Sequence, residues 1–235
     1  MSEITVGIGH NIRIYRKKNG LTLDALSDLV FKSKSALSKY ENGDISIDIE
    51  TLYELAEALH IHVEQLLYVR KSNTKITTSD AQPSFFNGVS RFYSYVFDGR
   101  SHQLLPSVFD ILSETDKNQF KIMMYMNYKT YDHYQDCETT YIGYIEHYDA
   151  VTNIMLTNQH SPMEKASAQI LASYLDSDMK WGLWNGLSSR PLMPIATKML
   201  FTKNRLRGKE DIINDLKISK EDIKLLRLYN MLPVL

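Results

Sequence analysis

The chain has almost no cysteine and no long apolar run, and both absences narrow its class. Cys137 is the only cysteine among 235 residues, so no intrachain disulfide can form, and nothing indicates an oxidising compartment. No apolar run approaches the roughly twenty residues that a membrane-spanning helix needs. Residues 1–10 lack the charged start and the apolar stretch of a signal peptide. We therefore expect a cytoplasmic protein that has no membrane partner.

A strong net charge is also lacking, because the formal net charge is -1. The distribution of charge along the chain is more informative than this total. Residues 8–43 carry seven Lys and Arg against three Asp and Glu, a net charge of +4, whereas residues 44–69 carry six acidic residues and no Lys or Arg. A short domain divided in this way has one face that attracts phosphates and one that repels them.

The first seventy residues have apolar side chains at helical spacing, interrupted by turn residues. Thr22 and Ser33 are expected to cap two short helices, and Asn42-Gly43 is expected to end the second of them. Each helix is too short to be stable alone, so the helices must pack together through their apolar faces. The expected core residues include Ile8, Ile12, Tyr15, Ala25, Leu26, Leu29, Ala36, Leu37, Tyr40, Leu52, Leu55, Ala56, Leu59, Val63, Leu66 and Leu67. We predict a five-helix domain over residues 1–70.

A polar linker is expected at residues 71–84, and beyond it the apolar period changes to strict alternation. Strands are expected at 91–98, 106–114, 120–128, 139–148, 151–159, 180–188 and 194–202, and helices at 209–217 and 219–230. The segment 163–175 fits either a helix or a strand. The fold class that we predict is α+β, with residues 85–235 forming a mainly antiparallel β-sheet or barrel with terminal helices.

The stretch from Leu21 to Leu66 resembles the helix-turn-helix domain of the Cro/C1 repressor (XRE) family. The similarity includes the pattern Ser33-Lys34-Ser35-x-Leu37-Ser38-Lys39, the Glu41-Asn42-Gly43 that follows it, and the later Glu50-Thr51-Leu52. It covers roughly residues 8–68. The resemblance implies that the helix after Ser33 enters the major groove of DNA while the helix before it crosses the sugar-phosphate backbone.

The resemblance also implies which side chains contact DNA. The residues nominated are Arg16, Lys17, Lys32, Ser33, Lys34, Ser35, Ser38, Lys39 and Asn42. Lys34, Ser35 and Lys39 are expected to reach base edges, with Ser38 beside them, and the others to contact or attract phosphates. Two of these residues also have a structural interpretation, because Arg16 fits a scaffold pair with Glu41 and Ser33 fits a helix cap. Phe31 stands where the family usually has glycine, so the geometry of the inter-helix turn is open.

Residues 85–235 carry no motif of comparable strength. We find no nucleophile with a placed base, no phosphate-binding loop and no metal-ligand pattern, so we expect neither enzymatic activity nor a cofactor. His133, Asp136, Cys137 and Glu138 are neighbours in the sequence, but their spacing matches no strong metal site. A polar hairpin tip is the simpler interpretation.

Aromatic and Met residues are concentrated in the expected strands, and some strands are apolar on both parities. Such a sheet either packs against other elements or lines a cavity. One hypothesis is a pocket for a small, partly apolar effector, and the alternative is a packed core with a dimer face. The pocket residues that we predict are Tyr93, Tyr95, Met124, Tyr125, Tyr144, Trp181 and Trp184.

The function indicated by these patterns is sequence-specific regulation of transcription. We expect a homodimer that binds double-stranded operator DNA, with an inverted repeat whose half-sites lie about one helical turn apart. An alternative is an antitoxin-like or scaffold protein whose C-terminal domain binds a partner protein.

Overall fold

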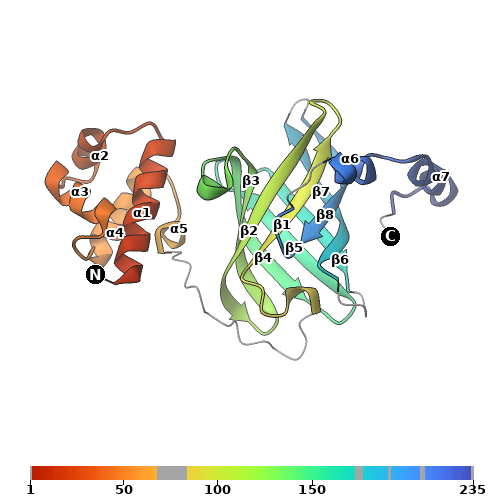
Figure 1. The fold of residues 1–235 in the computed structure, drawn as a ribbon, viewed down its shortest axis with the longest axis horizontal. Coiled ribbons are helices and arrows are strands. Elements are labelled where there is room, and N and C mark those ends of the chain that lie inside the picture. Colours follow the sequence, from red (N-terminus) through yellow and green to blue (C-terminus); the bar gives the residue numbers. More distant parts are fainter. Residues whose placement is uncertain (1, 68–83, 173–176, 190–191, 207–209, 234–235) are drawn as a thin grey trace. The chain divides into compact units, whose positions relative to one another are not determined.

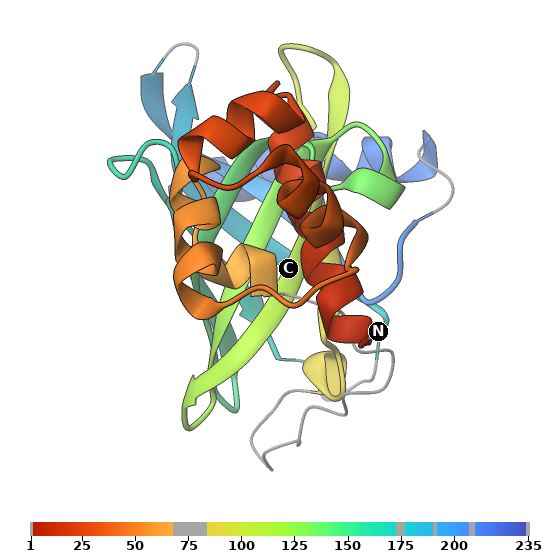
Figure 2. The ribbon, with the colours of Figure 1, turned by 90° about the vertical axis from the view of Figure 1, so that its left-hand side faces the viewer.

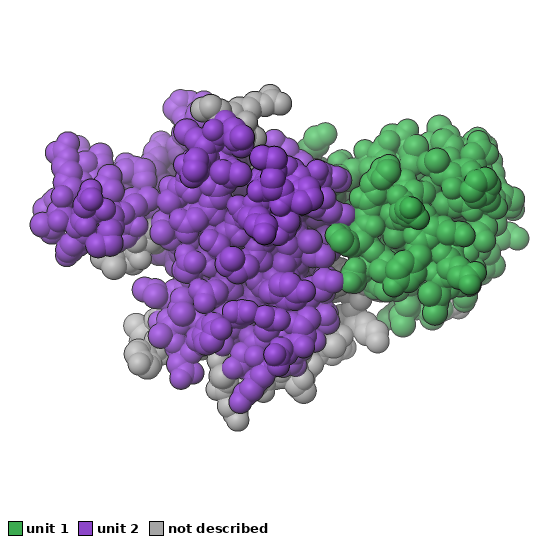
Figure 3. Space-filling model, turned by 180° about the vertical axis from the view of Figure 1, so that it is seen from behind, with its two compact units in different colours: residues 1–74, 129–136 green, residues 75–128, 137–235 purple. Residues whose placement is uncertain are grey.

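The computed structural model describes residues 2–67, 84–172, 177–189, 192–206 and 210–233. The chain divides into two compact units, which Figure 3 shows in different colours: residues 1–74 with 129–136, and residues 75–128 with 137–235. The predicted linker at 71–84 lies outside the described residues except for Ser84.

Helices make up the first unit (Figure 2). Their bounds are Glu3–Lys18 (α1), Leu23–Leu29 (α2), Lys34–Asn42 (α3), Ile49–Ala58 (α4) and Val63–Leu67 (α5). The predicted caps Thr22 and Ser33 begin α2 and α3, because each hydroxyl accepts a hydrogen bond from a backbone N–H in the first turn. Gly43 ends α3 with a φ of 72°, a left-handed conformation that glycine adopts without steric cost. The predicted helical domain is confirmed.

These helices enclose a core of apolar side chains. It consists of Ile12, Tyr15, Leu26, Val30, Leu37, Tyr40, Leu52, Leu55, Ala56, Leu59 and Leu66. The predictions that Leu29 and Leu67 belong to this core are wrong, because their side chains are 54% and 48% exposed. The buried positions here are Leu26 and Val30, which lie four residues apart on one helical face, whereas Leu29 is rotated away from that face.

Strands of the second unit form a closed antiparallel barrel (Figure 1). The strands are Arg91–Asp98 (β1), Gln103–Asp116 (β2), Gln119–Tyr128 (β3), Cys137–His147 (β4), Val151–Asn158 (β5), Lys165–Leu171 (β6), Met179–Ser189 (β7) and Leu192–Thr202 (β8). Each strand pairs with the next one in the chain, and β8 closes the barrel by pairing with β1. The predicted antiparallel barrel is confirmed, and the undecided segment 163–175 contains a strand.

Side chains alternate between the inside and the outside of the barrel, since successive residues of a strand point to opposite faces. The paired residues Phe92 and Phe109 belong to the inner core, and so do Met124 and Tyr141. Their neighbours on the opposite parity, such as Tyr93, point outward. Strand register therefore decides which aromatic residues can line an interior cavity.

One end of the barrel is closed by the short helix η1, Ser84–Phe86, which lies at the lower end of the barrel in Figure 1. Phe85 and Phe86 are buried, and the ring of Phe86 meets that of Phe92 edge to face, with centroids 5.3 Å apart. His147 belongs to the same layer. Its ring centroid lies 4.7 Å from that of Phe86, and its Nδ1 lies 3.0 Å from the hydroxyl oxygen of Thr152. This end of the interior is therefore apolar and aromatic.

The predicted terminal helices are present as α6, Glu210–Leu216, and α7, Lys220–Tyr229. α6 contacts β1 and β8. The hydroxyl of Tyr95 accepts a hydrogen bond of 3.0 Å from the backbone N–H of Leu206, and Nζ of Lys217 lies 5.2 Å from the centroid of the Phe97 ring. Later parts of the chain thus contact Tyr95 and Phe97, which share one parity of β1, and these contacts explain why the strand is apolar on both parities.

We predict that the barrel loses stability in mild acid because of His147. Burial lowers the pKa of this imidazole to about 4, since its charged form cannot be hydrated among the surrounding rings. The unfolded chain, with a histidine pKa near 6.5, therefore binds more protons than the folded chain between pH 6.5 and pH 4. The free energy of unfolding is expected to fall by about 3 kcal/mol as the pH decreases through this window, as measured by urea unfolding at a series of pH values.

The variant His147→Phe keeps a ring of similar size and is expected to flatten this pH dependence. His102→Asn is the matched control, because His102 is an exposed histidine in the β1–β2 hairpin. An identical slope in the parent chain and in both variants would show that another group is responsible.

Candidate DNA-binding surface and barrel cavity

The predicted base-reading residues lie together on the solvent face of α3. Lys34, Ser35 and Lys39 are exposed, Ser38 is half-buried, and Asn42 is exposed at the helix end. At 3.6 residues per turn these positions span about 140° of the helix surface. The opposite side of α3 is buried in the domain core through Leu37 and Tyr40. The helix therefore presents one continuous polar face that carries two lysines.

A buried ion pair attaches α3 to α1. Nε of Arg16 donates to Oε1 of Glu41 at 2.5 Å, and Nη2 donates to Oε2 at 2.9 Å. Nη1 of Arg16 donates to the carbonyl oxygen of Leu21 at 2.8 Å, which ties the start of the α2 segment to the same group. The hydrogen bond with Glu41 raises the pKa of Arg16. Both residues of this pair are buried.

The prediction of Arg16 as a DNA-contact residue therefore needs correction. Its guanidinium is committed to Glu41 and Leu21 and does not project from the surface, so the scaffold interpretation is the one that the structure supports. Lys17, the next residue of α1, is exposed. Ser33 is exposed as well, and its hydroxyl serves as the α3 cap at 3.1 Å from the N of Ala36.

Two of the predicted lysines form ion pairs in the DNA-free protein. Nζ of Lys34 lies 2.7 Å from a carboxylate oxygen of Asp24 in α2, and more than half of each side chain is exposed. Nζ of Lys32 lies 3.9 Å from a carboxylate oxygen of Glu54. Exposed pairs of this kind contribute about 0–1 kcal/mol, so they leave the lysines available to phosphates or bases at small cost.

The turn between α2 and α3 contains a residue whose backbone has the left-handed conformation, and this residue is not glycine. Phe31 has a φ of 50° and is 94% exposed. A side chain in this region is strained, because its Cβ approaches the following carbonyl oxygen. The sequence alone did not determine the geometry of this turn. In the structure, the turn places a strained and solvent-exposed aromatic residue shortly before α3.

The barrel contains a cavity of about 590 Å³ at the end opposite η1. The cavity wall combines apolar and polar side chains. It is lined by Val96, Phe97, Asp98, Gly99, Arg100, Ser101, Gln103, Leu105, Met126, Asn127, Glu138, Thr139, Tyr141, Glu164, Trp184, Leu187, Ser188, Met193, Ile195, Ala196 and Thr197. This volume lies within the range of about 300–1,000 Å³ that is typical of small-molecule sites.

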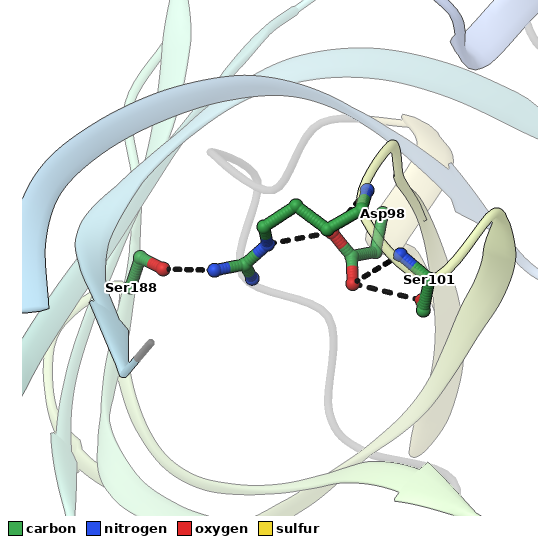
Figure 4. Close-up of polar contacts among 4 residues, drawn as sticks. Asp98, Ser101 and Ser188 are labelled. Atoms are coloured by element: carbon green, nitrogen blue, oxygen red, sulfur yellow. Dashed lines mark hydrogen bonds and ion pairs between the residues drawn. The ribbon is translucent and has the colours of Figure 1, made fainter. Parts of the chain in front are cut away.

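A hydrogen-bonded cluster crosses the mouth of this cavity (Figure 4). Nε of Arg100 donates to Asp98 at 3.1 Å, and its Nη1 donates to the hydroxyl of Ser188 in β7 at 2.6 Å. The Ser101 hydroxyl also donates to Asp98, at 2.8 Å. Burial would raise the pKa of Asp98, but the hydrogen bonds from Ser101 and Arg100 outweigh it and lower this pKa to about 2. Asp98 is therefore a carboxylate over the whole physiological pH range.

A second polar group lies on another part of the wall, where Tyr141 of β4 and Asn158 of β5 meet Glu164 of the β5–β6 turn. The Tyr141 hydroxyl donates to one carboxylate oxygen of Glu164, and Nδ2 of Asn158 donates to the other at 2.8 Å. Burial, followed by the hydrogen bond to Glu164, raises the pKa of Tyr141. The phenol thus stays protonated and holds the Glu164 carboxylate in place.

The predicted pocket residues fall mainly outside this cavity. Trp184 lines it, and Met124 is on the inner face but buried in the core. Tyr93, Tyr95, Tyr125, Tyr144 and Trp181 belong to the opposite parity and do not line it. Their assignment to an interior pocket is corrected, because one residue of offset along a strand reverses the face of the barrel. Trp181 instead lines an outer pocket of about 380 Å³ together with residues of α7 and the segment before it.

The sequence reasoning missed the polar residues of the mouth. The dipeptide Asp98-Gly99 is typical of a hairpin turn, and it is the only sequence signal that bears on this cluster. Arg100 and Ser188 lie 88 residues apart in the chain, and only closure of the barrel brings them together. Within the described ranges no group of three or more His, Cys, Asp or Glu residues is arranged to hold a metal ion. No described helix has the length and apolar character to cross a membrane.

The short helices α2 and α3, joined by a tight turn, form a helix-turn-helix unit within residues 12–66. A family model described as Helix-turn-helix (HTH_3) matches residues 12–66, which begin within α1 and end within α5. The match leaves the barrel outside the family model. A comparison with curated proteins found no match.

Several solved structures resemble parts of the chain. The restriction-modification controller protein C.AhdI from Aeromonas hydrophila is 27% identical over 26% of this chain and 94% of that chain, with a TM-score of 0.26. The clp gene regulator ClgR from Corynebacterium glutamicum is 28% identical over 27% of this chain and 68% of that chain, with a TM-score of 0.27. An HTH_3 family transcriptional regulator from Vibrio cholerae covers 85% of this chain and 89% of its own length at 14% identity and a TM-score of 0.28. Scores this low support no inference about the barrel.

We predict that Phe31→Gly stabilises the helical domain. Glycine relieves the left-handed strain at this position, and the gain exceeds the extra backbone entropy that glycine has in the unfolded chain. The free energy of unfolding of the helical unit is expected to rise by about 0.5–1 kcal/mol, as followed by circular dichroism at 222 nm during denaturation of the full chain. Phe31→Ala removes the ring but retains Cβ, so it is expected to give no comparable gain. Equal stabilisation by the two variants would assign the effect to the ring instead of the backbone.

Proposed function

We propose that the protein is a cytoplasmic, non-enzymatic, sequence-specific regulator of transcription, in which the helix-turn-helix domain reads operator DNA and the barrel binds a small effector. The observation that carries the DNA-binding part is the continuous face of α3 formed by Lys34, Ser35, Ser38 and Lys39. Lysine can donate to the O6 and N7 of guanine, and serine can pair with several base edges. The buried ion pair between Arg16 and Glu41 supports this proposal, because it holds α3 rigidly against α1.

The exposed lysines are proposed to have two distinct roles. Lys34 and Lys39 project from the recognition helix and are assigned to bases, whereas Lys17 projects from α1 and is assigned to the phosphate backbone. A base contact discriminates between sequences, and a phosphate contact strengthens binding to every sequence equally. The two roles can therefore be separated by measuring specificity and salt dependence together.

We predict that Lys39→Ala weakens binding to a selected operator by about 1–3 kcal/mol and relaxes the base preference at one position. Lys17→Ala is expected to weaken binding to all sequences and to reduce the slope of log K against log salt by about one. The operator is first selected from random duplexes with the full chain, and affinities are then measured by fluorescence anisotropy at several salt concentrations.

Two further variants complete this test. Lys117→Ala removes an exposed lysine of the barrel and is expected to change neither affinity nor preference. Asp24→Asn frees Lys34 from its ion pair and removes a negative charge beside α3, so it is expected to tighten binding modestly. Two results are incompatible with the proposed reading surface. One is a parent chain that does not bind DNA even in dilute buffer, and the other is an unchanged base preference in the α3 variants.

The proposed homodimer uses α7. Asp222 at the start of this helix accepts a hydrogen bond of 2.8 Å from Lys198 of β8, which anchors the helix to the barrel. No described residue of α7 is buried, and most of its apolar side chains, with Tyr229, are exposed, whereas Leu225 is half-buried. The exposed ones are Ile223, Leu226, Leu228 and Tyr229, followed by Met231. An amphipathic helix with an uncovered apolar side supports pairing with a second copy of the chain.

We predict that Leu226→Asp converts the dimer to a monomer, because it places a charge in the proposed apolar interface. Sedimentation equilibrium of the full chain at micromolar concentrations measures this directly. Lys224→Ala, on the same helix, is the control and is expected to remain dimeric. A parent chain that sediments as a monomer, or a Leu226→Asp variant that remains dimeric, contradicts this interface.

A further inference from the structure

The chemistry of the barrel cavity indicates what kind of effector it accepts, an inference that rests on the proposed sensing role of the barrel. The inner part of its wall is apolar, with Val96, Leu105, Met126 and Ile195 contributing aliphatic or thioether groups. A wall of this kind binds a compact apolar body through the hydrophobic effect. The polar groups near the mouth must then select the head group of the ligand.

The charged residues that line the cavity are predominantly acidic. They are Asp98, Arg100, Glu138 and Glu164, which give the described lining a net charge of -2. The positive charge of Arg100 is balanced by Asp98, with which it forms an ion pair of 3.1 Å. Arg100 is also held by Ser188 across the mouth. Its charge is therefore already compensated before any ligand enters.

The two remaining carboxylates have neutral hydrogen-bond partners. Glu138 accepts a hydrogen bond of 2.6 Å from the side-chain amide of Asn127, and Glu164 accepts from Tyr141 and Asn158. Neither carboxylate is in an ion pair within the described ranges. Glu138 is exposed, whereas Glu164 is half-buried and accepts directly from the Tyr141 hydroxyl. The cavity thus has a local excess of negative charge beside this phenol.

An aromatic corner stands next to these carboxylates. The rings of Tyr141 and Trp184 meet edge to face, with centroids 6.1 Å apart and planes at 84°. Gly186 lies on the same inner face of β7, and a Cβ there would stand 3.3 Å from Nε1 of Trp184, so the indole packs closely against the glycine backbone. Aromatic faces attract cations, and tryptophan attracts them most strongly.

We propose that this cavity binds a small organic cation, an ammonium group carried on a compact apolar body. The ammonium is placed between the Glu164 carboxylate and the corner formed by Tyr141 and Trp184, and the apolar body lies against the inner wall. A carboxylate supplies a charge-assisted hydrogen bond, and the rings supply a cation–π interaction. An anion would meet at the mouth an arginine whose charge Asp98 already compensates, and it would then lie near the carboxylates of Glu138 and Glu164.

The proposal is tested with three probes of similar shape and different charge. Phenethylamine is a cation at pH 7, 2-phenylethanol is neutral, and 3-phenylpropionate is an anion. Their dissociation constants for the full chain are measured by isothermal titration calorimetry. Trp184 fluorescence in a Trp181→Phe background locates the bound probe, because Trp181 lies outside the cavity. We expect the amine to bind about tenfold more tightly than the alcohol, and the acid to bind most weakly.

Glu164→Gln is the decisive variant, because it removes one negative charge and keeps the shape and polarity of the side chain. It is expected to weaken the amine about tenfold and to leave the alcohol unchanged. The unchanged alcohol then shows that the cavity is still folded. Glu146→Gln is the matched control, because Glu146 lies in β4 on the outward parity and does not line the cavity. It is expected to change none of the three affinities.

Three results would overturn the cation assignment: tighter binding of the acid than of the amine, equal affinity for all three probes, or no binding of the amine at millimolar concentration. The sensing role is tested separately by repeating the operator titration with saturating amine. An amine that binds at Trp184 without changing the affinity for DNA supports the ligand class and rejects sensing. An acid or alcohol that binds and does change the affinity for DNA supports sensing and rejects the ligand class.

Discussion

The proposed DNA-reading surface depends on one buried ion pair, the contact of Arg16 with Glu41. Removing either partner would leave a charge uncompensated in the interior, which typically costs 3–5 kcal/mol. The pair joins α1 to the C-terminal part of α3, and Nη1 of Arg16 also holds the carbonyl of Leu21 before α2. One guanidinium therefore sets the mutual positions of three helices. The lysines of α3 can be presented in a defined direction only because the opposite side of that helix is fixed in this way.

The barrel depends on a different constraint, the strict alternation of side chains in a closed ladder of hydrogen bonds. Once β8 pairs with β1, each strand has one inward face, and its residues either fill the interior or line the cavity. Phe85 and Phe86 fill one end, whereas the other end has Arg100, Glu164 and Trp184 around open space. A single barrel thus combines a packed core, which supplies stability, with a polar mouth that is suited to binding.

Local signals predicted most of the fold. The caps Thr22 and Ser33, the stop at Gly43 and the alternation in 120–128 act over a few residues, so they are visible in one sequence. β6 was undecided because its small residues Ala166 and Ala168 give little contrast between faces. The cavity residues were mostly missed because the choice of inward parity depends on strand register. Arg100 meets Ser188 only after the barrel has closed, and no local pattern encodes such a contact.

The aromatic helix η1 has a further consequence. It is the first described element of the second unit, reached directly after the stretch of chain that leads from the DNA-binding helices, and its two phenylalanines are embedded in the barrel core. The second unit therefore begins with residues that belong to the barrel core. A change of packing around Phe85 and Phe86 would thus act on the residues with which the second unit begins, and the proposed sensing role requires no other route to that point.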